Sequence, residues 1–334
     1  MRSKKNVDTT ILEVGETLTK EFDNYIVMAE NAVDWTLFCS YQLKPKFSEG
    51  IYKILQLPSM QIAYTQMDGG IMFDYVAPKE CITFSLMKHI SQEACIDQMK
   101  LKTGMIAVVD DKKIYNLVCS AEVEFLDVSL NKNANPILIE KLTQAVDKYY
   151  IDNNQKISIL IKGFITEFTK DGSLLDAQTS IEIEHQITEA MLTLLDRQEA
   201  QTPYFTKSEK TAIEVKNRLF KHMDHTMKVQ DFAKHYTISV KSLQNAFKSL
   251  FGLTPNKFMR LLKLNLIHHE LTQSTPSQVS VLAVASKWGF SHMGRFSKFY
   301  TELFATNPSV TLKNSIPNLD GMNTHCVERK EEMV

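Results

Sequence analysis

Cysteine is scarce in this sequence, and long apolar runs are absent. The five cysteines, Cys39, Cys81, Cys95, Cys119 and Cys326, form no C-x-x-C pair and none lies at zinc spacing from a histidine. An odd number at irregular spacing argues against a disulfide framework. We interpret them as small buried hydrophobes, with a redox-sensing thiol in the N-terminal region as the alternative.

The sequence contains no run of about 18 apolar residues, so no transmembrane helix is predicted. Its first residues are basic and then polar, without the apolar core of a signal peptide. We therefore expect a cytoplasmic protein, associated with the nucleoid if it binds DNA, and no membrane partner.

Residue patterns that carry catalysis are also lacking. A metal centre needs clustered His and carboxylate ligands, and His89 is the single histidine between residues 35 and 130. No Gly-rich phosphate loop, Ser/His/Asp set or Cys/His dyad stands out. We expect no enzymatic activity, no metal and no cofactor.

Charge is distributed unevenly along the 334 residues, although the net charge is only −1. Residues 207–314 contain 16 Lys and Arg but 6 Asp and Glu, a net charge of +10, whereas the remainder carries −11. A basic C-terminal third on an acidic front part is typical of a polyanion-binding module attached to a partner with another role.

Hydrophobic periodicity predicts an α+β chain in several parts. Short β-branched and aromatic runs between turn residues favour a barrel or sandwich. After them, Asn135-Pro136 starts a helix whose apolar face extends to Tyr149. A second helical stripe over about 180–197 includes Ile187, Met191 and Leu194, which either pack on their own domain or form a dimer contact. The domains expected are an N-terminal segment at 1–34, a β-rich domain at 35–135, its helical part at 136–197, a linker at 198–207, an all-helical domain at 208–314 and a loose tail at 315–334.

Two segments of the basic region resemble each other. They are DFAKHYTISVKSLQNAFKSLFGLTP, residues 231–255, and AVASKWGFSHMGRFSKFYTELFATNP, residues 283–308. Ala233 matches Ala285 at an offset of 52, and later matches such as Phe247 with Tyr300 lie at 53, so one residue is added in a turn. A short helix, a tight turn and a capped helix with a Leu/Phe-rich face predict a helix-turn-helix, present twice.

The core positions of the two units follow from this pattern. We expect Ser208 to cap the first helix of the domain, Ser239 to cap the second helix of the first unit and Gly252 to end that helix. Gly289 is expected to have a positive φ in the second turn. The expected core residues are Ala233, Leu243, Phe247, Ala285, Trp288, Gly289, Phe290, Phe296, Tyr300 and Pro308.

These motifs resemble the AraC/XylS family of bacterial transcription regulators. The family signature stands here as Trp288-Gly289-Phe290, Phe296-Ser297-Lys298-Phe299-Tyr300 and Pro308. LQNAF, KLNLIHHEL and the run from His292 to Leu312 are most similar to the ethanolamine-operon regulator, and YQLKPKF at 41–47 is a weaker likeness. Thr237 and Ala305 depart from the family because each replaces a usual glycine.

The resemblance implies a two-lobed DNA-binding domain. Its recognition helices would enter successive major grooves of double-stranded DNA, roughly 34 Å apart, held by a long helix from Pro255 to about Leu271. Polar and charged side chains on the outer faces are the candidate DNA contacts. Those expected at bases are Lys241, Gln244, Asn245, Met293, Arg295 and Lys298; those expected at phosphates are Ser242, Lys248, Lys228, Arg260, Lys263, Lys287 and Ser297.

For the front part, the resemblance implies a small cupin-like barrel that binds an effector or supports homodimerisation, and RNA polymerase as a further partner. Trp35, Phe73, Tyr75 and Phe84 are the residues expected at an effector pocket, unless they are simply core. The alternative function is an architectural DNA-binding protein or co-regulator that senses no small molecule and uses its front part only for protein contacts.

Overall fold

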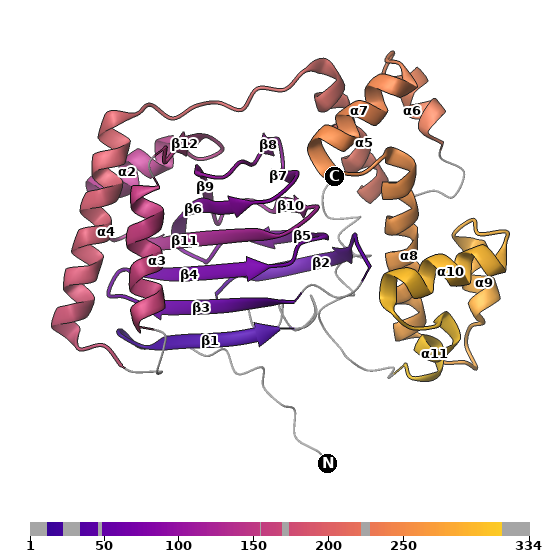
Figure 1. Ribbon diagram of the computed structural model, residues 1–334, viewed down its shortest axis with the longest axis horizontal. Helices are drawn as coiled ribbons and strands as arrows, with labels where there is room; N and C mark the ends of the chain where they lie inside the picture. Colours follow the sequence, from indigo (N-terminus) through magenta and orange to yellow (C-terminus); the bar gives the residue numbers. More distant parts are fainter. Residues whose placement is uncertain are drawn as a thin grey trace.

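The computed structural model describes residues 12–22, 34–45, 49–153, 155–168, 174–221 and 228–315. Over these residues a β-rich domain with its own helices is followed by a helical domain (Figure 1). The expected α+β arrangement, with a β-rich front part and two helical units joined by a long helix, is confirmed. The expected tail lies outside the described residues, apart from Ser315.

The strands form two antiparallel sheets that face each other. Within the described residues, one sheet has seven strands in the order β1-β3-β4-β11-β6-β9-β12, and the other has five in the order β2-β5-β10-β7-β8. Side chains from both sheets share one core between them. The strands are β1 Thr17–Phe22, β2 Thr36–Gln42, β3 Gly50–Gln56, β4 Met60–Met67, β5 Ile71–Val76, β6 Cys81–Ile90, β7 Ala94–Ile96, β8 Met99–Lys100, β9 Met105–Asp110, β10 Tyr115–Cys119, β11 Val123–Asn131 and β12 Tyr149–Ile151.

Strand β11 lies at the centre of the larger sheet and is covered on both faces. Leu126 and Val128 pack toward helices, whereas Phe125 and Asp127 point toward the second sheet, because successive side chains of a strand alternate. The pairing of β11 with β6 also shifts in register between Glu124 and Phe125, as at a β-bulge. This double coverage explains why apolar residues do not alternate simply along this strand.

Three helices cover the outer face of the seven-stranded sheet. Helices α2 (Pro136–Gln144) and α3 (Lys156–Phe168) pack on the sheet, and α4 (Ala177–Arg197) packs on α2 and α3. The helix expected to reach Tyr149 is shorter, because Asp147 adopts a left-handed φ of 63° and Tyr149 begins β12. Helix α3 was not anticipated from the sequence.

The apolar stripe of α4 faces the interior of its own domain. Ile187 and Met191 are fully buried and Leu194 is 9% exposed, all in the core beneath the helices. This corrects their proposed place in a dimer contact, since α2, α3 and the sheet already cover them.

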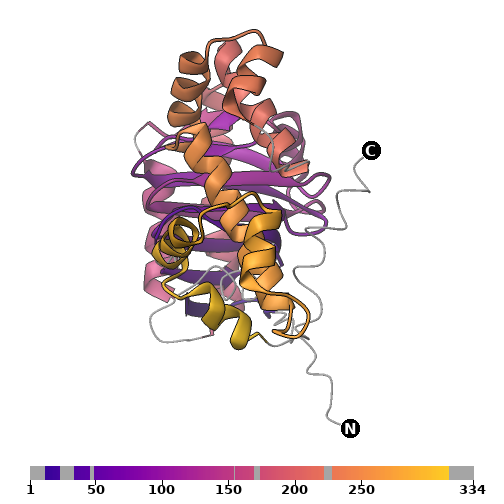
Figure 2. The same ribbon diagram turned by 90° about the vertical axis from the view of Figure 1, so that its right-hand side faces the viewer.

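The helical domain contains two short helix pairs joined by α8. Its helices are α5 Lys207–Lys221, α6 Val229–His235, α7 Val240–Phe251, α8 Pro255–Gln273, α9 Val281–Lys287, α10 Met293–Phe304 and α11 Pro308–Lys313. One apolar core runs through both units. Figure 2 shows α8 in front of the strands, between the two units. No helix of the described ranges is long and apolar enough to cross a membrane.

Helix caps follow the sequence at most ends of this domain. Ser239 Oγ accepts the backbone N–H of Ser242 at 3.0 Å, and Gly252 ends α7 with a φ of 65°, as expected. At α5 the expectation of Ser208 is corrected. Thr206 and Glu209 form a reciprocal capping box there, with Thr206 N–H to Glu209 Oε2 at 2.9 Å and Glu209 N–H to Thr206 Oγ1 at 3.3 Å.

Candidate DNA-binding surface and the cavity of the β domain

The turn of the second helical unit is built as the sequence predicts. Gly289 has a φ of 83°, a conformation that L side chains rarely adopt. Trp288 Nε1 donates to Glu270 Oε2 on α8 at 3.0 Å, and the Phe290 and Phe296 ring centroids lie 5.2 Å apart. The turn is therefore held by a hydrogen bond to α8 before Gly289 and by aromatic packing after it.

The residues expected in the core of the two units are packed together. Ala233, Leu243, Phe247, Ala285, Phe296, Tyr300 and Pro308 are buried, Trp288 and Phe290 are partly buried, and Gly289 is exposed at the turn. The Tyr300 hydroxyl lies 2.7 Å from His268 Nδ1 and donates to Thr311 Oγ1 at 3.0 Å. Burial lowers the pKa of His268 to about 4, so this imidazole is neutral near pH 7.

The outer face of α7 carries the expected polar residues. Lys241, Asn245 and Lys248 are exposed, whereas Gln244 and Ser242 are half-buried. The Ser242 hydroxyl also lies 2.8 Å from the Ser239 hydroxyl at the cap. Amide and ammonium groups of this kind suit base edges and phosphates.

The outer face of α10 is less polar. Arg295 and Lys298 are exposed, and Lys298 Nζ lies 3.9 Å from Glu302 Oε1. Met293 and Ser297 are half-buried, and Met293 packs against the core. Arg295 is thus the exposed group on this helix with a bidentate donor geometry.

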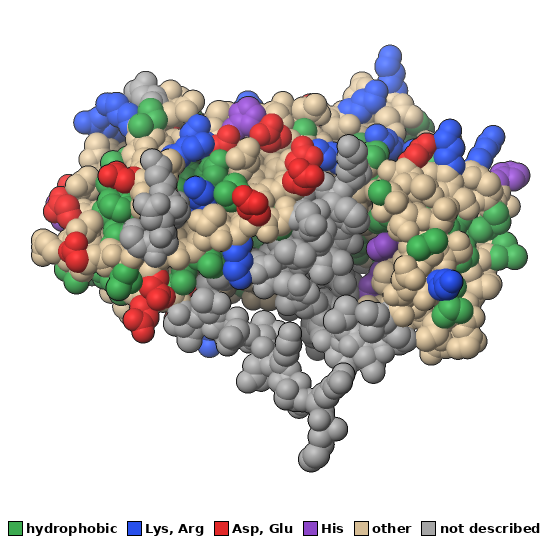
Figure 3. Space-filling model, turned by 60° about the horizontal axis from the view of Figure 1, so that its bottom comes forward, with side chains coloured by type: hydrophobic (Ala, Val, Ile, Leu, Met, Phe, Trp, Pro, Cys, Tyr) green, Lys and Arg blue, Asp and Glu red, His purple; other side chains and the backbone are tan. Residues whose placement is uncertain are grey.

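The candidate phosphate contacts differ in what already engages them. Arg260 stacks on Phe299 at 4.1 Å from the ring centroid, and Lys287 pairs with Glu270 at 3.0 Å. Lys228 is exposed and Lys263 is half-buried. Figure 3 shows Lys and Arg side chains standing out from the helical domain.

The helical domain is docked on the outer face of the five-stranded sheet. At the end of β2, the Gln42 backbone N–H donates to Asn265 Oδ1 of α8, and Asn265 Nδ2 donates to the Gln42 carbonyl, both at 2.8 Å. Gln42 Nε2 donates to the Leu303 carbonyl of α10 at 2.7 Å. A single strand end therefore holds both the connecting helix and the second unit.

A second contact holds the first unit. Lys216 on α5 is 2% exposed, and its Nζ donates to Asn116 Oδ1 of β10 at 2.6 Å. Asn116 Nδ2 in turn donates to Asp74 Oδ1 at 2.6 Å. Burial lowers the pKa of Lys216, an effect that the carboxylates of Asp97 and Asp74 oppose.

Sequence patterns did not single out Asn265 or Lys216, because each occupies an ordinary helical position. The available signals were two likenesses, YQLKPKF at 41–47, which includes Gln42, and KLNLIHHEL at 263–271, which includes Asn265. Lys241, Asn245, Lys248 and Arg295 stay exposed in this docked arrangement. Docking therefore leaves the candidate reading faces open.

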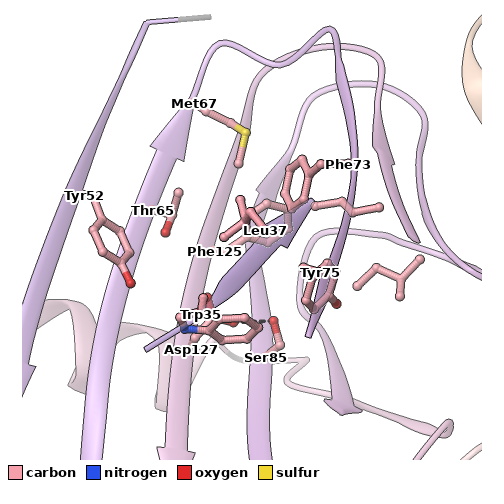
Figure 4. Close-up of a pocket in the computed structure, with 12 residues that line it drawn as sticks. Trp35, Leu37, Tyr52, Thr65, Met67, Phe73, Tyr75, Ser85, Phe125 and Asp127 are labelled. Atoms are coloured by element: carbon pink, nitrogen blue, oxygen red, sulfur yellow. Dashed lines mark hydrogen bonds between the residues drawn. The ribbon is translucent and has the colours of Figure 1, made fainter. Parts of the chain in front are cut away.

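A cavity of about 80 Å³ lies between the two sheets (Figure 4). Its lining is aromatic and aliphatic with three polar residues other than tyrosine. The lining residues are Trp35, Leu37, Tyr52, Thr65, Met67, Phe73, Tyr75, Ser85, Ile96, Leu117, Phe125 and Asp127.

Three of the four residues expected at an effector pocket line this cavity. Trp35 and Phe73 each lie within 6 Å of Tyr75, ring centroid to centroid, at 5.5 and 5.9 Å. Phe84 does not line it and packs in the core beneath the helices. The correction follows from strand alternation, because the cavity takes Ser85, the next residue of β6.

The cavity contains a carboxylate that the sequence analysis did not single out. Asp127 is only partly accessible, accepts a hydrogen bond from Ser85 Oγ, and has its pKa raised by burial to about 6. The nearby Tyr52 hydroxyl is buried and has no hydrogen-bond partner among the residues that the structure describes. The sequence alone does not tell which face of the strand Asp127 occupies, so it could not be distinguished from an exposed acidic residue.

The described cysteine side chains behave as the sequence predicts. Cys95 and Cys119 are buried and Cys81 is partly buried, all as free thiols. Burial raises the pKa of Cys81 and of Cys95 to about 11. The side chain of Cys39 and all of Cys326 lie outside the described residues.

Comparison with known proteins places the resemblance in the helical domain. Residues 232–314 match a family described as a helix-turn-helix domain. The probable thc operon regulatory protein of Rhodococcus erythropolis is 30% identical over 92 residues, which cover 28% of each chain. The XylDLEGF operon transcriptional activator of Pseudomonas putida is 28% identical over 109 residues, or 33% of this chain and 34% of that protein. The chain thus matches about a third of the length of these relatives.

A solved structure, the AraC-like transcriptional activator CuxR, aligns with 74% of this chain and 93% of its own, at 9% identity and a TM-score of 0.42. The assignment rests on the sequence match, the repeated turn and the shared core of α6 to α11. Together they identify residues 232–314 as a helix-turn-helix domain that is similar to part of these operon regulators.

Proposed function

We propose that the chain is a sequence-specific transcriptional regulator that binds double-stranded DNA. The observation that carries the proposal is the pair of helix-turn-helix units in one core, each with exposed polar side chains on its second helix. Helix α8 has 19 residues, so it is roughly 28 Å long. This length is close to the roughly 34 Å between successive major grooves.

Within this proposal, Lys241, Gln244 and Asn245 read bases from α7, and Arg295 is the main reader on α10. Met293 and Lys298 are secondary base contacts. The phosphate contacts are Ser242, Lys248, Lys228, Arg260, Lys263, Lys287 and Ser297. Arg260 and Lys287 contribute least, because Phe299 and Glu270 already engage them.

The proposal is tested by selecting bound sequences from random duplexes and then titrating the selected site over a salt series. We expect affinity to fall steeply with salt, because Lys and Arg release counterions from phosphates. Binding that does not depend on salt, or a selection that yields no preferred sequence, would contradict the proposal.

We further propose that the β domain senses an effector and supports homodimerisation in a cytoplasmic, nucleoid-associated regulator that also contacts RNA polymerase. The cavity supports the sensing role because the five-stranded sheet has two occupied faces. Phe73 and Leu117 face the cavity side, whereas Met72 and Val118 pack against the helical domain. A ligand that displaces side chains on the cavity face can therefore affect the helical domain on the opposite face, because only this one sheet lies between them.

In the alternative, an architectural DNA-binding protein, the cavity binds no effector. Light scattering of the full chain measures the dimer, and a co-migration assay with RNA polymerase measures the second contact. A regulator that binds DNA with the same affinity whatever occupies the cavity would favour the architectural role.

A further inference from the structure

The cavity between the sheets differs from the hollow beside the linker in how its carboxylate is paired. A larger hollow of about 420 Å³ beside the linker also contains charged residues, but there Lys113 pairs with Asp147 at 2.6 Å and with Asp97 at 3.4 Å. In the smaller cavity, Asp127 accepts from Ser85, and no Lys, Arg or His occurs among the described lining residues. A carboxylate drawn between two sheets costs free energy unless a positive group approaches it.

Aromatic side chains line the same cavity as this carboxylate. Trp35 and Tyr75 line the cavity with tilted rings 5.5 Å apart, and Tyr52 adds a ring with an unpartnered hydroxyl. Figure 4 shows these side chains converging from strands of both sheets on the space beside Asp127. Aromatic faces attract cations through their negative quadrupole, most strongly where water is excluded. The Tyr52 hydroxyl offers a free hydrogen bond to a polar substituent.

The volume limits the size of an occupant. A water-sized site needs about 10–15 Å³, so 80 Å³ accommodates roughly five to eight non-hydrogen atoms. Nucleotides and long acyl chains exceed this space. A small amine with a short apolar body fits it.

Resting on the proposed sensing function, we propose that the cavity binds a small organic cation, a protonated or quaternary amine with a short apolar body. Asp127 receives the positive charge, Trp35 and Tyr75 cover it with ring faces, and the Tyr52 hydroxyl bonds a polar substituent. The apolar body lies against Phe73 and Leu117, on the sheet that carries the helical domain.

The test uses the full chain and a matched set of probes. Butylammonium and tetramethylammonium are compared with neutral butanol, anionic butyrate and potassium chloride, by calorimetric titration and thermal shift. We expect the two ammonium ions to bind and raise the unfolding midpoint, and the other three to do neither. Equal or tighter binding of butanol or butyrate, an equal effect of potassium, or no binding of either ammonium ion would overturn the proposal.

Two variants locate the site. Asp127→Asn keeps the shape and removes the charge, so affinity for butylammonium should fall about tenfold or more. Glu124→Gln removes a charge from the same strand but on the helix side, where Glu124 pairs with Lys162 at 2.8 Å, and should leave affinity unchanged. Equal losses in both variants would show general charge attraction and overturn the site.

Failure of this inference is separable from failure of the proposed function. DNA binding is measured on the same preparation by fluorescence anisotropy. A chain that binds its selected site but no ammonium ion contradicts the cation site and leaves the DNA-binding function standing. A chain that binds ammonium but no DNA contradicts the function alone.

Discussion

At the residue scale, the structure separates candidate DNA contacts that are exposed from basic groups that are already engaged within the domain. Arg295 is exposed on α10, whereas Arg260 and Lys287 are engaged by Phe299 and Glu270. Charge alone does not distinguish them, because all three belong to the same basic region. The contacts of each side chain do distinguish them. Substitution of the exposed Arg295 is therefore expected to affect DNA binding more than substitution of Arg260 or Lys287.

Arg295→Ala is expected to weaken binding to the selected site by roughly tenfold to a hundredfold and to relax preference at one base pair, since a bidentate contact contributes about 1–3 kcal/mol. Anisotropy titrations against the selected and single-base-changed duplexes measure both effects. Arg295→Lys is the matched control, because it keeps the positive charge but loses the bidentate guanidinium. The preference for one base pair should therefore fall, while the dependence of DNA affinity on salt concentration should stay the same. Unchanged preference in both variants would refute the assignment.

Gly294 tests how closely α10 approaches DNA. Its φ is not positive, and a Cβ placed there meets nothing within 4 Å. Gly294→Ala is therefore expected to raise the free energy of unfolding by about 0.5–1 kcal/mol. We also expect weaker DNA binding, because a methyl group would stand between this backbone and the groove. Denaturant titration and anisotropy measure the two quantities; higher stability with full affinity would show that the backbone stays distant.

Asp127 makes stability depend on pH. Its pKa is about 6 in the folded chain against a usual 3.8, so its favourable contribution is complete below about pH 4 and is lost as pH rises through 6. Tyr52 and Tyr75 face it with pKa values raised further above 10 by burial, so they stay neutral in this window. Relative to the wild type, Asp127→Asn should gain on the order of 2 kcal/mol at pH 7–8 and little at pH 4.

Denaturant unfolding of both proteins at several pH values measures this difference. His268 acts with the opposite sign, because its lowered pKa makes stability fall as pH drops from 6.5 toward 4. It contributes equally to both proteins and cancels in the comparison. A difference that does not vary with pH would contradict the burial of Asp127.

At the element scale, the two units end their turns and helices with different residues in the same backbone conformation. Gly252 and Ala305 cap α7 and α10 with φ of 65° and 54°. Thr237, in the first turn, has a φ of 53°, where the second turn has Gly289 at 83°. Thr237 and Ala305 therefore adopt the left-handed backbone conformation that glycine usually provides, and their Cβ atoms make that conformation sterically unfavourable.

Thr237→Gly and Ala305→Gly are each expected to raise the free energy of unfolding by about 0.5–1 kcal/mol, because glycine removes the Cβ strain but loses more chain entropy. The two gains should add, since the sites are in different units. Gly252→Ala is the matched control and should destabilise by about 1 kcal/mol or more. Its added Cβ would also lie 2.7 Å from Ser120 Cβ. Thermal and denaturant unfolding of the wild type, the two single variants, their double variant and Gly252→Ala measure these changes.

At the scale of the whole molecule, one sheet separates the cavity from the DNA-binding domain. Asn265 pairs with both backbone groups of Gln42, as a neighbouring strand would, and is 5% exposed. Lys216 and Asn116 form a second polar contact. Buried polar pairs of this kind fix one docked arrangement, because any other leaves their groups unsatisfied.

Asn265→Ala is expected to loosen this docking and to cost about 1–3 kcal/mol, because it removes the two buried hydrogen bonds between Asn265 and the Gln42 backbone. Hydrogen exchange at the Gln42 amide should accelerate, and any effect of a cavity ligand on DNA affinity should shrink. Asn256→Ala, at an exposed position of the same helix, is the control and should change neither. Slow exchange retained in Asn265→Ala would contradict this role.

The sequence by itself determined the helix-turn-helix domain, because its signals are local. Ser239, Gly252 and the Leu/Phe spacing act within one or two turns of chain, and the repeat supplies the Leu/Phe spacing twice. The β-rich character of the front part was also predicted from local signals, the short β-branched and aromatic runs between turn residues. Three aromatic residues of the cavity were also identified, since large aromatics are drawn to enclosed spaces.

The tertiary structure alone decided which faces of the strands meet and how the domains dock. Phe84 and Ser85 are adjacent, yet one lies under the helices and the other in the cavity, because pairing fixes the register of β6. Asp127 and the pairing of Gln42 with Asn265, 223 residues apart, depend on contacts that no local pattern encodes. The stripe of α4 likewise fits either a dimer or a core until α2 and α3 are seen to cover it.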